Sequence, residues 1–143
     1  MALTDQEKRD FLARVELFAG VDPSHIGALA DTLVEADFRA GAYIAIQGQV
    51  GTGLYIIASG HARAVMGDDV LAHFGPGDFF GELSVLDREP RMANVVADES
   101  TVTLALPSWD LFAILEREPK VAIAMLVELS RRLRALSEQQ HRH

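Results

Sequence analysis

One segment near the middle of the chain brings a glycine, a carboxylate and an arginine close together. Gly81 is followed directly by Glu82, and Arg91 comes shortly afterwards, behind Pro90. Glycine allows close approach to the backbone because it has no side chain. A guanidinium binds a phosphate through paired hydrogen bonds, and a carboxylate accepts hydrogen bonds from hydroxyl groups. These residues can therefore hold a small molecule that carries an anionic phosphate and a neutral diol.

Each of the two charged residues also has an ordinary explanation. Residues Glu82 to Leu86 can form one helical turn, and a carboxylate at its start is favoured by the helix dipole. The free N–H groups of such a turn form an anion site that needs no metal. Arg91 taken alone is explained by a solvated surface position. If the strand after it enters a barrel, Arg91 instead points toward apolar surroundings and needs an anion there.

Composition excludes several classes of protein. The 143 residues fit one domain, which we expect to span residues 1–143. No cysteine is present, which excludes disulfides, thiolate zinc sites and cysteine nucleophiles and fits a cytoplasmic setting. The formal net charge of -8 is unfavourable for binding DNA. The N-terminus lacks the apolar core of a signal peptide, and no apolar run reaches the roughly 18 residues of a membrane span.

Residues 1–34 have the pattern of two helices. Thr4 and Glu7 have the spacing of a capping box, which marks the start of the first helix. Asp22 and Pro23 form a good N-cap and first-turn pair for the second. These helices are expected to end near residue 34, where the pattern changes.

Residues 35–107 have the pattern of short strands separated by glycines. The apolar runs are Tyr43–Ile46, Leu54–Ile57, Asn94–Val96 and Thr101–Leu106. Short strands with glycine turns are typical of a small antiparallel barrel. The predicted fold class is therefore α+β: an eight-stranded antiparallel jelly-roll β-barrel with N-terminal helices, a short helical turn at residues 82–86 and two C-terminal helices.

Residues 108–140 have the pattern of those two C-terminal helices. Ser108 is expected to cap the first, and Pro119 to open the second, which runs to about Gln139. In the second helix, apolar residues at coiled-coil spacing are Ala122, Leu126, Leu129, Leu133 and Leu136. This spacing fits packing on the barrel and also pairing with a partner, and we expect a homodimer through this helix.

Two other features of the C-terminal helices are expected to be structural. Trp109 is predicted to pack the first turn of its helix onto the barrel. Arg131, Arg132 and Arg134 are predicted to lie on the solvated face of the last helix.

The segment that contains Glu82 and Arg91 resembles the phosphate-binding cassette of cyclic nucleotide-binding domains. The matching runs are Gly81-Glu82-Leu83-Ser84 and Pro90-Arg91-Met92-Ala93. The stretch from Gln47 to Gly60 is similar to the glycine-spaced strand pair of the same family, which includes the bacterial catabolite activator protein and the regulatory subunits of protein kinase A. The resemblance extends from about Leu17 to Ser137.

The resemblance implies a role for most residues of the cassette. Glu82 would accept a hydrogen bond from the ribose 2'-hydroxyl, and Arg91 would pair with the cyclic phosphate. Backbone amides near Gly81, Leu83 and Met92 would complete the phosphate site, and the purine would lie between the barrel wall and the last helix. The implied ligand-binding set is Gly81, Glu82, Leu83, Ser84, Arg91, Met92 and Ala93.

Two departures from the family pattern bear on the ligand. Met92 stands where many relatives carry alanine, serine or threonine, and a hydroxyl there favours cGMP. Because methionine offers no hydroxyl to guanine, the sequence favours cAMP, with cGMP as the alternative ligand. On the last helix, the resemblance places Leu136 and Ser137 against the base, where the catabolite activator protein has a threonine and a serine.

We therefore expect a non-catalytic sensor or regulatory module that binds a cyclic nucleotide and needs no cofactor and no metal. Phosphate capture would tighten the loop from residue 81 to 91, Leu83 and Leu86 would shift their packing, and the last helix would cover the base. Besides the nucleotide and a second copy, we expect an effector protein as partner and no membrane. Because the chain stops at His143, we expect no helix-turn-helix and no DNA binding by that route.

Three other interpretations remain open at this point. A cupin-like metalloenzyme would need clustered ligands, whereas His61 and His73 form no His-x-His pair. An interaction domain whose pocket is vestigial or holds another anion would account for Met92 and Leu136. An excised regulatory domain of a larger kinase, channel or transcription factor would have the same sequence as a free-standing one.

Overall fold

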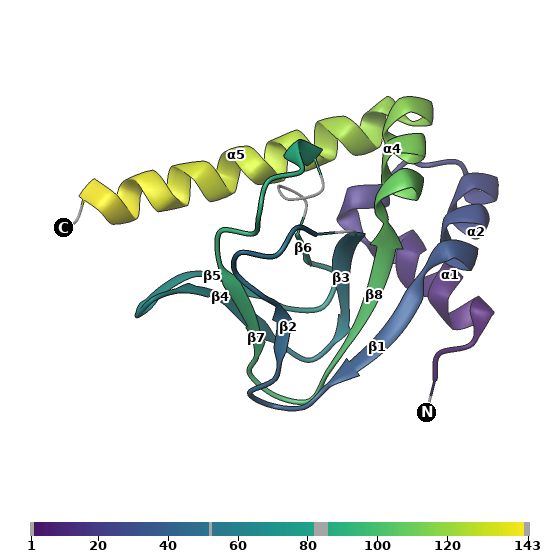
Figure 1. The fold of residues 1–143 in the computed structure, drawn as a ribbon. Helices are drawn as coiled ribbons and strands as arrows, with labels where there is room; N and C mark the ends of the chain where they lie inside the picture. Colours follow the sequence, from purple (N-terminus) through teal and green to yellow (C-terminus); the bar gives the residue numbers. More distant parts are fainter. Residues whose placement is uncertain (1, 52, 82–85, 142–143) are drawn as a thin grey trace.

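The computed structural model describes residues 2–51, 53–81 and 86–141 of the chain (Figure 1). In this part of the chain, eight antiparallel strands form two four-stranded sheets, with helices before and after them. The helices before the strands are α1 (Asp5–Arg14), the short 3-10 helix η1 (Glu16–Phe18) and α2 (Pro23–Thr32). Those after the strands are α4 (Ser108–Arg117) and α5 (Pro119–His141). The predicted α+β jelly roll is confirmed, and the helical turn expected at residues 82–86 falls largely outside the described residues.

The first sheet carries the longest strands and has the order β1-β8-β3-β6. These strands are β1 (Val34–Phe38), β8 (Thr101–Pro107), β3 (Gly53–Ser59) and β6 (Phe79–Phe80). The short strand β6 pairs with the middle of β3 and ends directly before Gly81. The first sheet therefore holds the start of the candidate site at one of its edges.

The second sheet faces the first and has the order β2-β7-β4-β5. Its strands are β2 (Tyr43–Ala45), β7 (Asn94–Ala97), β4 (Ala62–Met66) and β5 (Asp69–Phe74). The strand β7 pairs with both β2 and β4, and it begins just after Arg91. The two sheets thus hold the candidate cassette at both ends, Gly81 after β6 and Arg91 before β7.

The N-terminal helices begin at the two caps expected from the sequence. The Thr4 hydroxyl accepts a hydrogen bond from the Glu7 N–H at 3.1 Å, and the Glu7 carboxylate accepts one from the Thr4 N–H at 3.0 Å. At α2, the Asp22 carboxylate accepts from the side chain and the backbone N–H of Ser24, at 2.7 and 2.9 Å. These two hydrogen bonds lower the pKa of the Asp22 carboxyl, since they favour its charged form.

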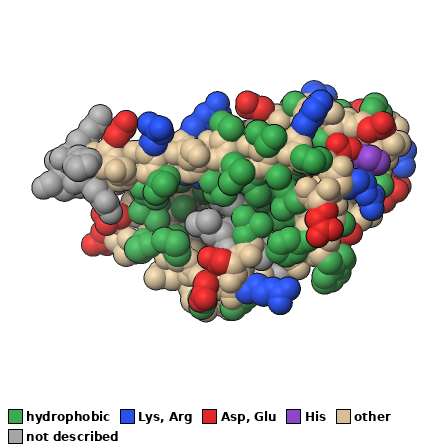
Figure 2. Space-filling model, turned by 90° about the horizontal axis from the view of Figure 1, so that it is seen from above, with side chains coloured by type: hydrophobic (Ala, Val, Ile, Leu, Met, Phe, Trp, Pro, Cys, Tyr) green, Lys and Arg blue, Asp and Glu red, His purple; other side chains and the backbone are tan. Residues whose placement is uncertain are grey.

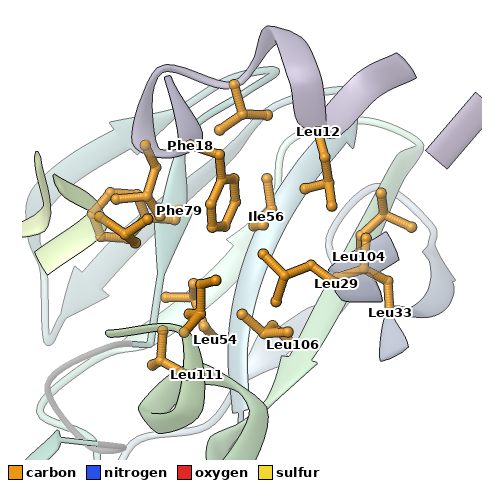
Figure 3. Packing of buried hydrophobic residues seen from close by; sticks show 14 of the residues in the cluster. Leu12, Phe18, Leu29, Leu33, Leu54, Ile56, Phe79, Leu104, Leu106 and Leu111 are labelled. Atoms are coloured by element: carbon orange, nitrogen blue, oxygen red, sulfur yellow. The ribbon is translucent and has the colours of Figure 1, made fainter. Parts of the chain in front are cut away.

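A hydrophobic core joins the N-terminal helices, the first sheet and the C-terminal helices. Figure 3 shows Leu12, Phe18, Ile56 and Leu104 packed together, from α1, η1, β3 and β8. The same cluster contains Val121 and Met125, through which the first turns of α5 pack on the rest of the molecule. A second cluster fills the space between the two sheets, and Ile57, Phe74 and Phe80 belong to it.

Two predictions about α4 are wrong. The N-cap position is Pro107, without a side-chain hydrogen bond, and Ser108 is already the first helical residue, because β8 continues directly into the helix. Trp109 is 72% exposed and does not pack on the barrel. The helix turns Leu111 and Ile114 toward the core instead, so the opposite face carries Trp109 to the surface.

The predicted apolar seam of α5 is divided between barrel and surface. Ala122, Leu129 and Leu136 are half-buried, whereas Leu126 is 63% and Leu133 is 69% exposed.

No helix in the described part of the chain combines the length and apolarity that crossing a membrane requires.

Candidate functional site

The backbone of Arg91 is tied to the turn between β2 and β3. Its N–H donates to the carbonyl of Gln49 at 2.8 Å, and its own carbonyl accepts from the N–H of Gly48 at 2.9 Å. Beside these hydrogen bonds, Val50 and Pro90 form an isolated antiparallel bridge. Because the backbone is held on both sides, the direction in which the Arg91 side chain leaves the chain is set by the fold.

The guanidinium of Arg91 lies against two glycines and an aromatic ring. A Cβ atom at Gly51 would lie 2.5 Å from Nη2, and a Cβ atom at Gly81 would lie 2.8 Å from Nη1. The Cζ atom lies 5.5 Å from the centre of the Tyr55 ring, within the range of a cation–π interaction. Gly81 also has a φ of 91°, a backbone conformation that favours glycine. Both glycines are thus part of the site because they leave room for the guanidinium.

A methyl group at position 51 should displace the guanidinium without straining the backbone, since only Gly81 of the two has a positive φ. We expect Gly51→Ala to weaken binding of the proposed nucleotide by about tenfold, or ~1.4 kcal/mol. Isothermal titration calorimetry measures this change. The control is Gly75→Ala, whose added methyl would lie 3.2 Å from the His61 ring and away from Arg91. Equal affinities of the two variants would mean that the position of the guanidinium does not matter.

Aromatic side chains lie next to Arg91, and the sequence analysis did not assign them to the site. Tyr55 and Phe80 face each other across β3 and β6, with ring centres 5.3 Å apart and nearly parallel planes. The ring centre of Phe74 lies 5.1 Å from that of Phe80. The pair Phe79-Phe80 directly before Gly81 was the available signal, since one of two successive strand residues necessarily faces the barrel interior.

The side chain of Arg132 on α5 contacts the barrel. Its Cζ atom lies 4.6 Å from the ring centre of Phe79 and 5.2 Å from that of Phe74, and its guanidinium donates to the Phe79 carbonyl. Its Nε atom donates to Glu128 at 3.1 Å. The predicted solvated position is therefore wrong for Arg132, whose side chain is 20% exposed. Helical periodicity cannot show this contact, because the aromatic rings lie far away in the sequence.

The comparison with known families shows to which family this chain belongs. Residues 35–118 match the model of the cyclic nucleotide-binding domain, and this match contains the whole segment from Gly51 to Arg91. The chain belongs to the cyclic nucleotide-binding domain family. The predicted membership of this family is thereby confirmed, and the roles of the individual cassette residues stay predictions.

Relatives of this cyclic nucleotide-binding domain include a transcriptional regulator and a protein kinase regulatory subunit. A CRP-like cAMP-activated global transcriptional regulator of Mycobacterium tuberculosis is 39% identical over 135 residues, which cover 87% of this chain and 58% of the relative. The solved structure described as cAMP bound PfPKA-R (141-441) superimposes with a TM-score of 0.86 at 25% identity and covers 95% of this chain and 47% of its own.

A third relative comes from a kinase that is described as independent of cAMP. The regulatory subunit of a cAMP-independent protein kinase A from Trypanosoma brucei superimposes with a TM-score of 0.81 at 29% identity, covering 97% of this chain and 52% of its own. The present domain spans about half the length of these relatives.

The predicted ligand-binding residues of this domain fall into three groups. Gly81 and Arg91 lie together, as described above. Met92 is 58% exposed and Ala93 half-buried, in the short segment between Arg91 and β7. Glu82, Leu83 and Ser84 lie outside the described residues.

The helix α5 lies across one end of the barrel (Figure 1). Figure 2 shows hydrophobic side chains gathered beside this helix on the same face of the molecule. Leu136 is half-buried and Ser137 exposed, about one turn beyond Arg132. The helix that carries the two predicted base contacts is therefore attached to the barrel shortly before them, by Arg132.

The metalloenzyme interpretation gains no support from the described part of this domain, in which no group of three or more His, Asp or Glu side chains is suited to hold a metal ion. His25 pairs with Glu118, and His61 lies 3.5 Å from Glu99.

Proposed function

We propose that this domain is a cytoplasmic, non-catalytic sensor of cyclic nucleotides and that cAMP is its preferred ligand. The observation that carries the proposal is the half-buried guanidinium of Arg91, which lies between Gly51, Gly81 and the Tyr55 ring. In this position a planar cation can present paired N–H donors to a phosphate, while the two glycines leave room for the guanidinium beside the backbone.

The remaining ligand contacts follow from the cassette pattern. Glu82 accepts a hydrogen bond from the ribose 2'-hydroxyl, and backbone amides near Gly81, Leu83 and Met92 complete the phosphate site. Ser84 and Ala93 complete the proposed ligand-binding set. No metal or cofactor takes part in this arrangement.

The preference for cAMP rests on the apolar character of the base contacts. Met92 is exposed next to Arg91 and has no hydroxyl that can bind guanine. Leu136 contributes only apolar surface from α5, and Ser137 is the one hydroxyl beside it. Two of the three relatives described above point the same way, because one is a cAMP-activated regulator and the other was solved with cAMP bound.

The signal is proposed to leave the site through α5. Phosphate capture tightens the loop between residues 81 and 91 and shifts Leu83 and Leu86, and α5 then covers the base. Of these two leucines, Leu86 is 36% exposed in the described structure and so has room to change its packing. A ligand drives this change only as far as it binds the closed state better than the open one.

The test is a calorimetric titration of the purified, nucleotide-free chain with cAMP and with cGMP. Micromolar or tighter binding of cAMP, with weaker binding of cGMP, supports the proposal. Absence of heat with both nucleotides contradicts it and favours a second candidate, an interaction domain whose pocket is vestigial or holds a different anion. That candidate is favoured by the Trypanosoma brucei relative, which belongs to a cAMP-independent protein kinase A.

A second copy of the chain is the proposed partner of α5, and the nucleotide-dependent pair then acts on an effector protein. Ile123, Leu126 and Leu133 are 60%, 63% and 69% exposed, at intervals that place them along one side of the helix. Side chains of this size at coiled-coil spacing are stabilised by burial against an identical helix.

The substitution Leu133→Glu should dissociate this homodimer, because it places a charge in an apolar interface. Sedimentation velocity should show a dimer for the parent chain and a monomer for the variant at the same micromolar concentration. The control is Val34→Glu, which makes the same kind of change at a 59% exposed residue of β1. A parent chain that sediments as a monomer with and without nucleotide would contradict the proposal.

A further inference from the structure

A column of stacked side chains connects Arg91 to Arg132. The Arg91 Cζ atom lies 5.5 Å from the Tyr55 ring centre, and the Tyr55 and Phe80 rings stack at 5.3 Å with an angle of 17°. Phe80 contacts Phe74 at 5.1 Å and 32°. The Arg132 Cζ atom lies 5.2 Å from the Phe74 ring centre. The two cations at the ends of the column belong to the proposed phosphate site and to α5.

We propose that this column couples the position of the Arg91 guanidinium to the attachment of α5, with Tyr55, Phe80 and Phe74 as positioning residues. The identity of the anion that moves Arg91 rests on the proposed function. The column itself consists of described contacts within this chain, and it assigns a path for the signal that the cassette residues alone do not specify.

The rings are placed where a small displacement is transmitted. Phe80 is 2% and Phe74 is 6% exposed, and both belong to the close-packed cluster between the two sheets. Tyr55 and Phe80 are direct cross-strand neighbours, so their contact is fixed by the register of β3 and β6. In a packed interior, a ring that shifts moves its neighbour, because no free volume absorbs the shift.

The two arginines give the column electrostatic ends. A cation over an aromatic face is attracted by the negative face of the ring, and the attraction grows when the pair is shielded from water. When an anion draws the Arg91 guanidinium away from Tyr55, the preferred position of the Tyr55 ring changes. At the other end, Arg132 also lies over Phe79 and donates to its carbonyl, so a movement of the Phe74 and Phe79 rings acts directly on α5.

Coupling through the backbone from β6 into Gly81 is the competing explanation. That path does not depend on the rings of Tyr55, Phe80 and Phe74. Replacing the central ring by an aliphatic side chain therefore separates the two explanations.

The experiment measures amide hydrogen exchange over residues 128–139 of α5 in the ligand-free chain. We expect Arg91→Ala to change this exchange by about threefold or more in the parent chain and to leave it unchanged when Phe80→Leu is also present. The matched control background is Phe38→Leu, the same substitution at a half-buried residue that packs against the same cluster but lies outside the column. Tyr55→Phe keeps the ring, so in this background Arg91→Ala should change the exchange of α5 as it does in the parent.

Two results would overturn the proposal. One is an Arg91→Ala variant whose α5 exchange equals that of the parent. The other is an equal effect of Arg91→Ala in the parent and in the Phe80→Leu background. If Phe80→Leu does not fold, Tyr55→Leu at a half-buried position replaces it.

A second arm repeats the measurement at saturating cAMP, so that a change in affinity does not affect the result. We expect cAMP to change α5 exchange in the parent and in Phe38→Leu, and to do so at least about threefold less in Phe80→Leu. A full response in Phe80→Leu overturns the coupling proposal while the proposed function stands. If cAMP does not bind the parent, the proposed function fails. The ligand-free arm still decides whether the column couples Arg91 to α5.

Discussion

The substitution Arg91→Ala should weaken cAMP binding by about 2 to 4 kcal/mol, which corresponds to a dissociation constant roughly 30- to 1,000-fold higher. The guanidinium is held beside Gly51 and Gly81, and its loss removes the proposed bidentate partner of the phosphate. Folding should survive, because the side chain is half-buried at the site and lies outside both core clusters. Calorimetry gives the affinity, and circular dichroism melting gives the stability.

Two further variants show what kind of contact Arg91 makes. Arg91→Lys keeps the charge but loses the planar fork and the stacking on Tyr55. We therefore expect its affinity for cAMP to lie between those of the parent and of Arg91→Ala. Arg117→Ala removes the same charge at an exposed position of α4 and should bind as the parent does. If Arg91→Ala also binds as the parent does, the assignment of the phosphate site to Arg91 is wrong.

The largest effect on stability is expected for Phe18→Ala. Phe18 is 2% exposed in η1 and packs in the core between the N-terminal helices, the first sheet and α5. Removing a buried phenyl ring costs about 3 to 5 kcal/mol, from lost burial and from the cavity left behind. Urea unfolding of the parent and of Phe18→Ala measures the difference in their free energies of unfolding.

The matched control for Phe18→Ala is Trp109→Ala. The Trp109 side chain is larger but 72% exposed, so its removal should change the free energy of unfolding by less than about 0.5 kcal/mol. A large loss of stability for Trp109→Ala would support the original expectation that this residue packs on the barrel. Similar losses of unfolding free energy in both variants would mean that the burial of a side chain in the structure does not explain its contribution to stability.

Local signals in the sequence predicted the starts of α1, α2 and α5 and several strands. The capping box at Thr4 and the Asp22 cap depend on residues within one turn of each other, and both are present in the structure. The predicted helix from Pro119 to about Gln139 is also confirmed, as α5. The missed strands include β6, whose two residues are too few to show a period.

The errors concern side chains whose environment comes from distant parts of the chain. Ser108 has the type of a helix cap, but β8 runs through Pro107 and leaves no separate cap position for it. Arg132 has the spacing of a solvated residue, yet the barrel supplies Phe74 and Phe79 as partners.

The sequence by itself determined the fold class, the family and the residue types of the proposed phosphate site, because each depends on residues that are close together in the chain. Gly81, Glu82 and Arg91 could be selected in this way. Only the tertiary structure decided that Gly51 makes room for the Arg91 guanidinium and that stacked rings lead from it to α5. Such contacts join three strands and a helix, β3, β5, β6 and α5, and their existence depends on how the two sheets pack together, which local periodicity does not encode.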